Sequence, residues 1–198
     1  TKTFYSLKNT PPQTGATRLD TYDNSWYRPG KPFWVMLLWY FCNILVFKSH
    51  LLPVNRLKVV LLRLFGAKIG EGVVIKPGVS IKYPWKLQTG NHVWIGEDVW
   101  IDNLALVTLG DHSCVSQGAM LLTGSHNYKK STFDLVTGEI HLEAGAWAGA
   151  KTVVCPGVTC HSHSVLAVNS VAVKNLQAYG IYQGNPATLK RTRTITDN

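Results

Sequence analysis

His126 has the residue type and the position that best suit acid–base chemistry. The side chain of an unperturbed histidine titrates near neutral pH, so it can accept a proton from a hydroxyl group that is about to attack. His126 ends a stretch of regularly spaced β-branched residues, and residues 127–141 then break the spacing. At such a break a side chain can project into a cleft. We therefore consider His126 a candidate catalytic base, against the alternative of an ordinary surface histidine.

Cys155, Cys160, His161 and His163 form a cluster of potential metal ligands. Thiolate and imidazole groups are usual ligands of zinc. In the repeat described below, Cys160 should point inward and Cys155 outward, so these two side chains cannot readily share one metal ion. The sequence therefore predicts no metal site.

The segment that must position His126 carries a six-residue repeat from Ile69 onward. One position of the repeat is mostly aliphatic and the fifth position is mostly small, with Trp85 as the exception in the second column. The aliphatic position holds Ile69, Ile75, Ile81, Thr89, Ile95, Ile101, Leu109, Val115, Leu121, Leu142, Ala148, Val154, Cys160, Leu166 and Ala172.

Three insertions interrupt the repeat, and each follows a third hexad. The first two are Leu87-Gln88 and Val107-Thr108, and the third is the long segment 127–141. If three hexads make one turn of a triangular coil, all three insertions leave from the same corner. Stacked coils bury the aliphatic column continuously and pair their strands in parallel, which predicts an all-β solenoid. The register predicts five coils, over 69–86, 89–106, 109–126, 142–159 and 160–177.

The solenoid is expected to span residues 69–177, and the segments on either side of it do not follow the six-residue repeat. Residues 1–30 are rich in Thr, Asn, Pro and Gly, which predicts an extended arm. Residues 31–68 are expected to form two helical pieces, the first of them Phe33–Phe47. Residues 178–198 are expected to form a basic C-terminal tail.

The formal net charge of +9 predicts attraction to polyanions such as nucleic acid, anionic lipid or a phosphorylated small molecule. Four cysteines without a CxxC pair favour a reducing compartment, so we expect a cytoplasmic protein. The apolar run Phe33–Phe47 is shorter than the roughly 20 residues that cross a bilayer, and it is not expected to be transmembrane.

Residues 48–68 contain five basic residues and no acidic one. Beside an aromatic helix, this composition suggests peripheral attachment to anionic lipid at the inner face of the membrane. The alternative is a helical cap that hides the open end of the first coil, which solenoids need. The sequence leaves both interpretations open.

Four segments of the chain resemble the hexapeptide-repeat acyltransferases, and more closely the sugar O-acetyltransferases of exopolysaccharide synthesis. They are HVWIGEDVWIDNLA (92–105), LLTGSHNY (121–128), GAWAGAKTVVCPGVT (145–159) and QGNPATLKR (183–191). The resemblance covers nearly all of the chain from Asn24 to Arg193. It implies a left-handed parallel β-helix, a homotrimer, and acetyl-CoA as co-substrate in a groove between coils. It gives the positive charge a partner in the CoA phosphates, so no nucleic-acid partner is expected.

The resemblance also implies roles for individual residues. His126 would be the general base that deprotonates a sugar hydroxyl, and the hydroxyl would attack acetyl-CoA directly, without an acyl-enzyme. Backbone N–H groups near Gly149 and Ala150 would hold the oxyanion. Asn103, with Asp102 as a weaker second, is the candidate for orienting the acceptor hydroxyl, and the alternative for both is a corner residue that satisfies a turn. The residues expected to contact acetyl-CoA are Trp147, Gly149, Ala150, Lys151, Ala167, Val168, Lys174, Lys190 and Arg191.

The repeat register bears on the assembly. His126 closes the third face of one coil, whereas Trp147 closes the first face of the next coil, so the two residues belong to different corners of the prism. We therefore expect Trp147 of a neighbouring subunit to reach His126. Ala148, Cys155 and Cys160-His161 depart from the family pattern, which affects local packing and not the chemistry.

Two other functions remain open at this point. A γ-class carbonic anhydrase has the same fold and binds zinc through three histidines, but this chain has no HxxxxH pair, although His92 and His112 should stack one coil apart. The chain could also be a non-catalytic scaffold that binds a nucleotide sugar or a partner enzyme. The sequence does not identify the acceptor sugar, the hydroxyl acetylated, or whether the acceptor is free, nucleotide-linked or lipid-linked.

Overall fold

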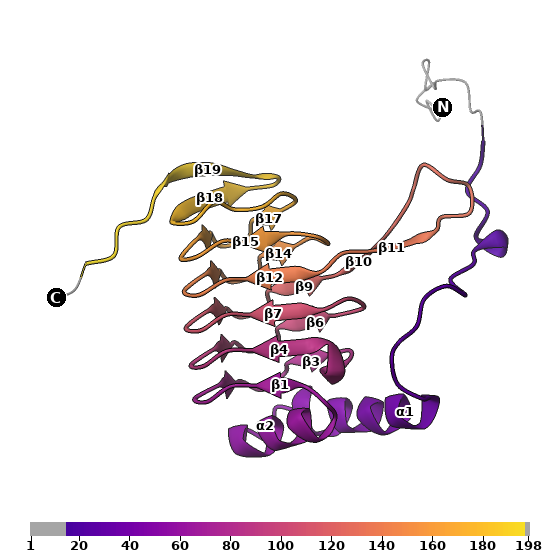
Figure 1. Ribbon diagram of the computed structural model, residues 1–198, viewed down its shortest axis with the longest axis horizontal. Coiled ribbons are helices and arrows are strands. Elements are labelled where there is room, and N and C mark those ends of the chain that lie inside the picture. The colour runs from indigo at the N-terminus through magenta and orange to yellow at the C-terminus, as the bar shows by residue number, and fades with distance from the viewer. Residues whose placement is uncertain (1–14, 197–198) are drawn as a thin grey trace, which may run out of the picture.

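The computed structural model describes residues 15–196 and is a parallel β-helix with helices at its N-terminal end (Figure 1). Three parallel sheets form the walls of a triangular prism. The first wall contains β1 (Lys68–Ile69), β4 (Leu87–Thr89), β7 (Val107–Leu109), β12 (Ile140–Leu142) and β15 (Thr159–Cys160). The second contains β2 (Val74–Ile75), β5 (Trp94–Ile95), β8 (Cys114–Val115), β13 (Trp147–Ala148), β16 (Val165–Leu166), β18 (Gly180–Gly184) and β19 (Ala187–Thr192). The third contains β3 (Ser80–Ile81), β6 (Trp100–Asp102), β9 (Met120–Leu122), β14 (Val153–Val154) and β17 (Val171–Ala172).

Strand pairing confirms the predicted hexad register. Ile69 pairs with Thr89, Thr89 with Leu109, Leu109 with Leu142, and Leu142 with Cys160. The corresponding columns of the other two walls hold the remaining aliphatic positions in the same way. Nearly all of these side chains are buried in one continuous core. The fold is thus specified by side chains that repeat at the spacing of the turns.

The extra residues of the longer coils are accommodated at one corner of the prism, between the third wall and the first, but two of the predicted insertions do not themselves leave the wall. The dipeptides Leu87-Gln88 and Val107-Thr108 are strand residues, because they lengthen β4 and β7, and Leu87 pairs with Val107 and Val107 with Ile140. The chain that bulges at the corner is therefore the segment before each dipeptide. At the end of the first coil this segment includes the short helix η3 (Pro84–Lys86).

Glycines after the aliphatic position allow the coils to approach closely. A Cβ atom on Gly110 would lie 2.7 Å from the amide nitrogen of Ala144, and one on Gly149 would lie 2.7 Å from the carbonyl oxygen of Leu166. Neither glycine has a positive φ. Glycine is therefore needed at these positions because the next coil occupies the space of a Cβ atom, and not because the backbone is left-handed.

The third insertion forms an antiparallel hairpin of β10 (Gly124–His126) and β11 (Leu135–Thr137). Figure 1 shows this hairpin leaving the prism on the side where the N-terminal segment rises from α1. That segment contains η1 (Leu19–Thr21) and is joined to the hairpin tip by the Arg18 amide, which donates to the Ser131 carbonyl at 2.7 Å. The part of the predicted arm that the structure describes is therefore docked on the protein; residues 1–14 lie outside the described range.

The segment 178–198, expected as a tail, holds β18 and β19 in its described part. β18 pairs in parallel with β16, and Leu176 bridges to Cys160, so the chain begins a sixth turn. β19 folds back antiparallel on β18. The buried Tyr182 continues the aliphatic column of the second wall, so β18 extends the core.

Helices cover the other end of the prism. They are α1 (Phe33–Cys42), continued by the π-helical turn η2 (Asn43–Phe47), and α2 (Asn55–Leu64). Trp39, Phe47 and Leu62 are buried against the first coil, and the Trp39 indole N–H donates to the Ile81 carbonyl at 2.7 Å. In the described range no helix is long and apolar enough to span a membrane.

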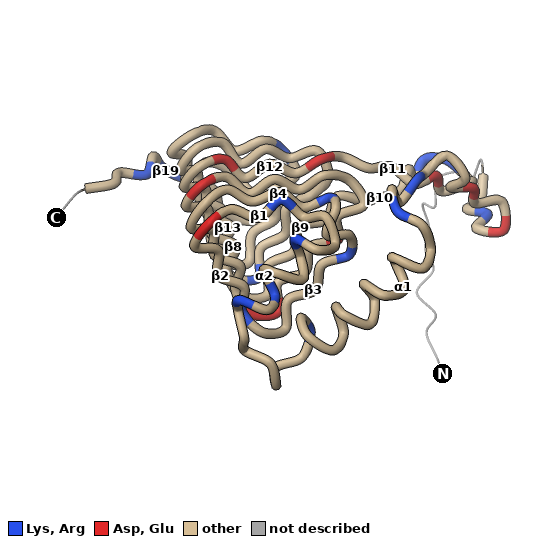
Figure 2. Tube along the Cα trace, turned by 60° about the horizontal axis from the view of Figure 1, so that its bottom comes forward, with Lys and Arg blue, Asp and Glu red and all other residues tan. Residues whose placement is uncertain are grey.

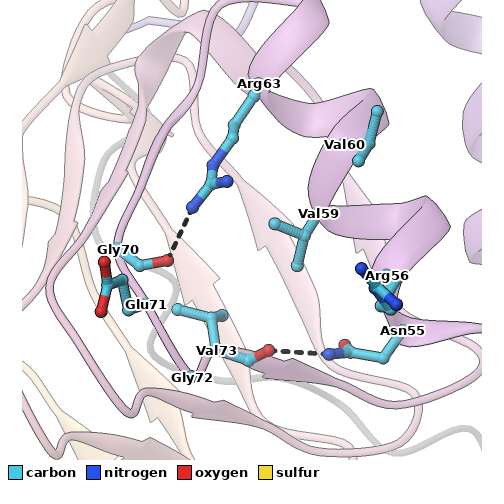
Figure 3. A pocket seen from close by; sticks show the side chains of 9 residues that line it. All are labelled: Asn55, Arg56, Val59, Val60, Arg63, Gly70, Glu71, Gly72 and Val73. Atoms are coloured by element: carbon cyan, nitrogen blue, oxygen red, sulfur yellow. Dashed lines mark hydrogen bonds between the residues drawn. The ribbon is translucent and has the colours of Figure 1, made fainter.

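Side chains of these helices bond to the open edge of the first coil. Asn55 donates to the Val73 carbonyl at 2.8 Å, and Arg63 donates to the Gly70 carbonyl at 3.0 Å (Figure 3). Arg63 also donates to the Ile69 carbonyl at 2.8 Å. The buried Lys58 ammonium donates to the Lys76 carbonyl at 2.9 Å. An edge strand exposes unpaired backbone groups, and these contacts satisfy several of them. The helical segment is thus a cap, as one of the two sequence interpretations proposed.

Candidate functional site

The imidazole of His126 is held by the turn of its own hairpin. Its Nδ1 lies 2.9 Å from the Phe133 carbonyl oxygen, and its ring stacks on the Phe133 ring with centroids 4.4 Å apart. A carbonyl oxygen can only accept, so Nδ1 carries the proton of this bond. The neutral ring then has its lone pair on Nε2, for which no hydrogen-bond partner is found among residues 15–196. His126 is therefore in the tautomer that a base requires.

His126 lines a cleft of about 480 Å³ where three parts of the chain meet. One side comes from the N-terminal segment, one from the corner chain of the first two coils, and one from the hairpin. Tyr22 lies against the imidazole, with ring centroids 5.7 Å apart. The lining residues are Tyr22, Asn24, Tyr27, Pro29, Lys82, Tyr83, Leu104, His126 and Leu135.

Tyr27 and Lys86 fix the N-terminal segment to the corner chain. The Tyr27 hydroxyl donates to the Leu104 carbonyl at 2.8 Å, and the Lys86 ammonium donates to the same oxygen at 2.6 Å. The ammonium also lies 4.6 Å from the centre of the Tyr27 ring. Burial raises the pKa of the Tyr27 hydroxyl and lowers the pKa of Lys86. Tyr27 is therefore a neutral donor at any working pH, and it fastens one wall of the cleft.

Asn103 lies beneath this cleft and not in it. Its side chain is fully buried; the oxygen accepts from the Tyr83 amide at 2.9 Å, and the nitrogen donates to the carbonyls of Tyr83, at 2.6 Å, and Lys86, at 3.1 Å. All of these partners are backbone groups. This arrangement corrects the expectation that Asn103 contacts the acceptor, because its amide has no free polar atom to offer; Asn103 is a positioning residue for the 83–86 turn.

Asp102 lies beside the cleft and pairs with one of its lining residues. Its carboxylate is 3.0 Å from the Lys82 ammonium, and it lines a second groove that reaches down to α1. Its side chain is mostly buried, whereas that of Lys82 is partly exposed. Asp102 is therefore linked to the cleft by its ion pair with Lys82, which lines the cleft.

Trp147 belongs to a different site on the second wall. Its indole N–H donates to the Ser116 hydroxyl at 2.8 Å, and 45% of the residue is exposed. Together with Trp94, Cys114, Ser116 and other residues, it lines an open groove of about 410 Å³. No residue lines both this groove and the His126 cleft. Within one chain, His126 and Trp147 are thus not brought together, as the repeat register predicts.

The backbone donors expected to hold an oxyanion lie at the corner that follows the second wall. The Gly149 amide donates to the Leu166 carbonyl at 2.9 Å within the ladder, so it is occupied. The Ala150 amide has no acceptor within the described range, which leaves Ala150 as the available donor. Ala167 and Val168 occupy the same corner one coil further on; the Ala167 amide is bonded to the Tyr182 carbonyl, and Val168 is exposed.

The basic residues expected near the CoA phosphates are all exposed but lie on several elements. Lys151 stands at the corner after the second wall, with its amide bonded to the Gln117 carbonyl. Lys174 follows β17 of the third wall, whereas Lys190 and Arg191 lie on β19. The structure thus places Lys190 and Arg191 together at the C-terminal end and Lys174 on another wall.

The four side chains of the cysteine–histidine cluster do not converge on one point. No group of three potential ligands is close enough to hold a metal ion within residues 15–196. Cys160 points into the core, where burial raises its pKa to about 12, and His161 instead pairs with Glu143 at 3.0 Å. His92 and His112 stack with centroids 5.1 Å apart, as the register predicts.

Sequence reasoning missed Tyr22, Tyr27, Lys82 and Tyr83, which line the cleft, and Phe133, which contacts the His126 imidazole. The only signal for them was the aromatic stretch near Asn24–Tyr27, which lies far from His126 in the chain. Their role follows from the docking of the N-terminal segment on the hairpin, which no local pattern encodes.

Comparison with known proteins places this geometry in context. No protein-family model matches the chain. A relative in Escherichia coli K12, assigned to colanic acid biosynthesis as the acetyltransferase WcaF, is 39% identical over 160 residues, which cover 81% of this chain and 88% of that protein. The galactoside O-acetyltransferase of the same organism is 24% identical and covers 72% of this chain and 71% of its own.

Solved structures show the same fold. A hexapeptide-repeat acetyltransferase from Vibrio cholerae, crystallised with acetyl coenzyme A, superposes with a TM-score of 0.73 at 22% identity, over 81% of this chain and 88% of that chain. A galactoside acetyltransferase in complex with coenzyme A gives a TM-score of 0.71 at 21% identity, over 81% of both chains.

Proposed function

The chain belongs to the hexapeptide-repeat acetyltransferases, and from this premise we propose that it transfers an acetyl group from acetyl-CoA to a hydroxyl of a sugar in exopolysaccharide biosynthesis. The class of enzyme, an acyltransferase, follows from the family. The acetyl donor is proposed because two proteins of the same fold were crystallised with acetyl-CoA or CoA. The sugar acceptor is proposed from the relative assigned to colanic acid biosynthesis.

The observation that carries the proposal is the hydrogen bond of His126. Because Nδ1 is committed to the Phe133 carbonyl, Nε2 is left as the acceptor, and it belongs to a residue that lines an open cleft. A buried structural histidine would have both nitrogens occupied. A base needs one nitrogen held and the other free, which is the arrangement found here.

In the proposed reaction, His126 Nε2 takes the proton of the acceptor hydroxyl while the hydroxyl oxygen attacks the carbonyl carbon of the thioester. The oxyanion that forms is held by the Ala150 amide of a neighbouring subunit. Collapse of the intermediate breaks the C–S bond, and the imidazolium returns the proton to the leaving CoA thiolate. The Phe133 carbonyl holds Nδ1–H throughout and favours the imidazolium that forms.

We infer that the working form is a homotrimer in which the Trp147 groove of one subunit faces the His126 cleft of the next. The separation of the two sites within one chain supports this arrangement. Trp147 would line the path of the acetyl-pantetheine arm, and Lys190 and Arg191 would meet the CoA phosphates with charge-assisted hydrogen bonds. A monomer that is active in solution would contradict this arrangement of subunits.

The test is turnover of labelled acetyl-CoA against a panel of free, nucleotide-linked and lipid-linked sugars. In His126→Ala we expect kcat to fall by about 10²- to 10⁴-fold, the usual contribution of a general base, with unchanged circular dichroism. Tyr128→Ala, an exposed residue of the same loop, is the matched control and should keep activity. Equal turnover by wild type and His126→Ala would exclude His126 as the base.

Two other functions give different results in the same assay. A non-catalytic scaffold that binds a nucleotide sugar would show no turnover in the wild type with any acceptor. A γ-class carbonic anhydrase would contain stoichiometric zinc and hydrate CO₂. No observation in the described part of the chain favours either, and the proposal does not depend on a metal.

A further inference from the structure

The helices that cap the solenoid leave a large apolar surface on their outer side. More than half of the large exposed apolar side chains of residues 15–196 lie between residues 33 and 64. The most exposed of them are Phe33, Trp34, Leu45, Leu51 and Leu64, each between 63% and 89% accessible. We call the outward side of residues 33–64 the end surface. Contiguous apolar surface of this kind marks an interaction site in most soluble proteins.

Helix α1 is apolar on all sides, although only one of its sides is buried. Its ten residues, FWVMLLWYFC, include no charged side chain. Trp39 points into the solenoid, whereas Trp34, Leu38 and Phe41 follow one another at helical spacing on the exposed side. A helix that is apolar all round needs apolar surroundings all round. The solenoid supplies them on one side only, so within residues 15–196 the outer side of α1 is exposed.

The length and orientation of the helices favour a partner with a flat surface. Together α1 and η2 have 10 and 5 residues and extend about 22 Å, which is less than the roughly 30 Å of a bilayer core. Figure 1 shows α1 and α2 lying across the end of the prism instead of along its axis. Helices in this orientation can lie in the plane of a membrane surface while the solenoid extends away from it.

The charge of this part of the chain is of one sign. Between Asp23 and Glu71 the sequence has seven basic residues and no acidic one. Lys31, Lys48, Arg56 and Lys68 are exposed at or beside the end surface, and Figure 2 shows the basic positions at this end of the tube. Lysine and arginine around an apolar helical face are complementary to a bilayer that contains anionic lipid.

A groove connects the end surface with the His126 cleft. It has a volume of about 390 Å³ and runs between α1 with η2 and the third wall. Met36, Tyr40 and Ile44 line it on the helical side, and Trp100 lines it on the strand side. Lys82 and Tyr83 line both this groove and the His126 cleft. An acceptor that entered from the end surface would therefore meet a lysine just before it reached the catalytic histidine.

We propose that the end surface docks on an anionic lipid bilayer, and that the groove between α1 and the third wall takes the lipid-phosphate stem of a membrane-held acceptor whose sugar reaches His126. The choice of acceptor rests on the proposed acetyltransferase function, whereas the docking does not. Apolar side chains of the groove match a hydrocarbon stem. Lys82, whose ammonium lies 3.0 Å from the Asp102 carboxylate that also lines the groove, would turn from that carboxylate to donate to a phosphate. In a cyclic trimer with parallel solenoids the three end surfaces face one way, which strengthens binding by avidity.

The experiment is flotation of the full chain with vesicles of phosphatidylcholine, with and without about 30% phosphatidylglycerol as the anionic component of a bacterial-type surface. We expect binding only to the anionic vesicles, with loss at high salt. Trp34→Ser combined with Leu38→Ser, and separately Lys31→Glu combined with Arg56→Glu, should each lower the bound fraction at least about tenfold. Tyr128→Ser and Lys129→Glu, exposed residues of the 127–141 loop, are the matched controls and should bind as the wild type does.

The outcomes separate docking from catalysis. His126→Ala should float as the wild type does, so a failure of the proposed function leaves the docking result intact. Absence of flotation, or flotation that the end-surface variants do not change, would overturn the proposal. Light scattering compares the oligomeric states of the wild type and of Trp34→Ser/Leu38→Ser. A difference between them would also overturn the proposal, because the end surface would then bind a second copy of the chain. Farnesyl phosphate is the probe for the groove between α1 and the third wall. If it fails to bind the wild type, the proposal that this groove takes the lipid-phosphate stem is overturned.

Discussion

The imidazole of His126 is oriented by a main-chain carbonyl and not by a carboxylate. The Phe133 carbonyl fixes the tautomer, and the Phe133 ring fixes the plane of the imidazole. Phe133 itself has a φ of 52°, a conformation that a bulky residue seldom adopts. The hairpin thus accepts backbone strain at the residue that makes both contacts, which is usual where a loop orients a functional side chain.

Asn103 provides a prediction at the scale of a single residue. In Asn103→Ala, backbone groups of Tyr83 and Lys86 lose buried hydrogen-bond partners. We expect the free energy of unfolding to fall by about 1–3 kcal/mol, and kcat to fall because Tyr83 and Lys82 line the cleft. Chemical denaturation and steady-state kinetics measure the two effects.

The control for Asn103 is Asn91→Ala, which removes a single bond at an exposed corner and should cost less than about 0.5 kcal/mol. If Asn103 instead contacted the acceptor directly, its substitution would raise KM for the acceptor and leave the stability unchanged. That result would restore the role inferred from the sequence.

At the scale of elements, the functional cleft depends on two pieces that do not belong to the repeat. The β10–β11 ladder places His126 opposite Leu135, and the docked N-terminal segment closes the cleft with Tyr22 and Tyr27. The repeat supplies only the side formed by the corner chain of the first two coils. Because the hairpin and the N-terminal segment hold each other through the Arg18 and Ser131 backbones, we expect them to order together.

The cap helix α2 carries a prediction about pH. Lys58 is buried with one carbonyl partner, and burial lowers its pKa. Between the lowered pKa of the folded state and the ordinary value of 10.5, Lys58 binds fewer protons in the folded chain than in the unfolded chain. The free energy of unfolding therefore gains from Lys58 as the pH rises through this window. The free energy of unfolding of the wild type, minus that of Lys58→Met, should therefore increase with pH by at most about 1.4 kcal/mol per pH unit.

Urea denaturation from neutral to alkaline pH measures this difference. Lys48→Met, which removes an exposed lysine of the same cap, controls for the loss of one positive charge. A difference between wild type and Lys58→Met that stays constant with pH would show that Lys58 binds protons equally in the folded and unfolded chains, and that its pKa is not lowered by folding.

At the scale of the whole molecule, the proposed active site lies between subunits, and mixing variants tests this directly. His126→Ala and Trp147→Ala should each be inactive alone. After unfolding and refolding together in equal amounts, about one quarter of the interfaces of a cyclic trimer combine an intact His126 with an intact Trp147. We therefore expect about a quarter of the wild-type activity, measured as acetyl-CoA turnover after co-refolding.

The outcome depends on which subunit supplies each residue. If both residues of a site came from one subunit, no mixed assembly would contain a complete site, and activity would stay at the level of the single variants. Wild type carried through the same unfolding and refolding controls for the recovery of folded protein.

The sequence alone determined the solenoid, because a six-residue column of aliphatic side chains is a local pattern that must be satisfied in every coil. The same register places His126 and Trp147 at different corners of the prism. It also located the insertions at one corner, since each of them follows a third hexad.

Only the tertiary structure decided how the cleft is made, because its walls come from segments distant in sequence. Tyr27 bonds to Leu104, 77 residues away, and no periodicity links the two. Asn103 looked like an acceptor ligand by its motif, but its amide is spent on the backbone of the neighbouring coil. Composition did not distinguish the cap and membrane interpretations of residues 31–68. In the structure the inner side of the helices forms the cap, and their outer side is exposed among residues 15–196.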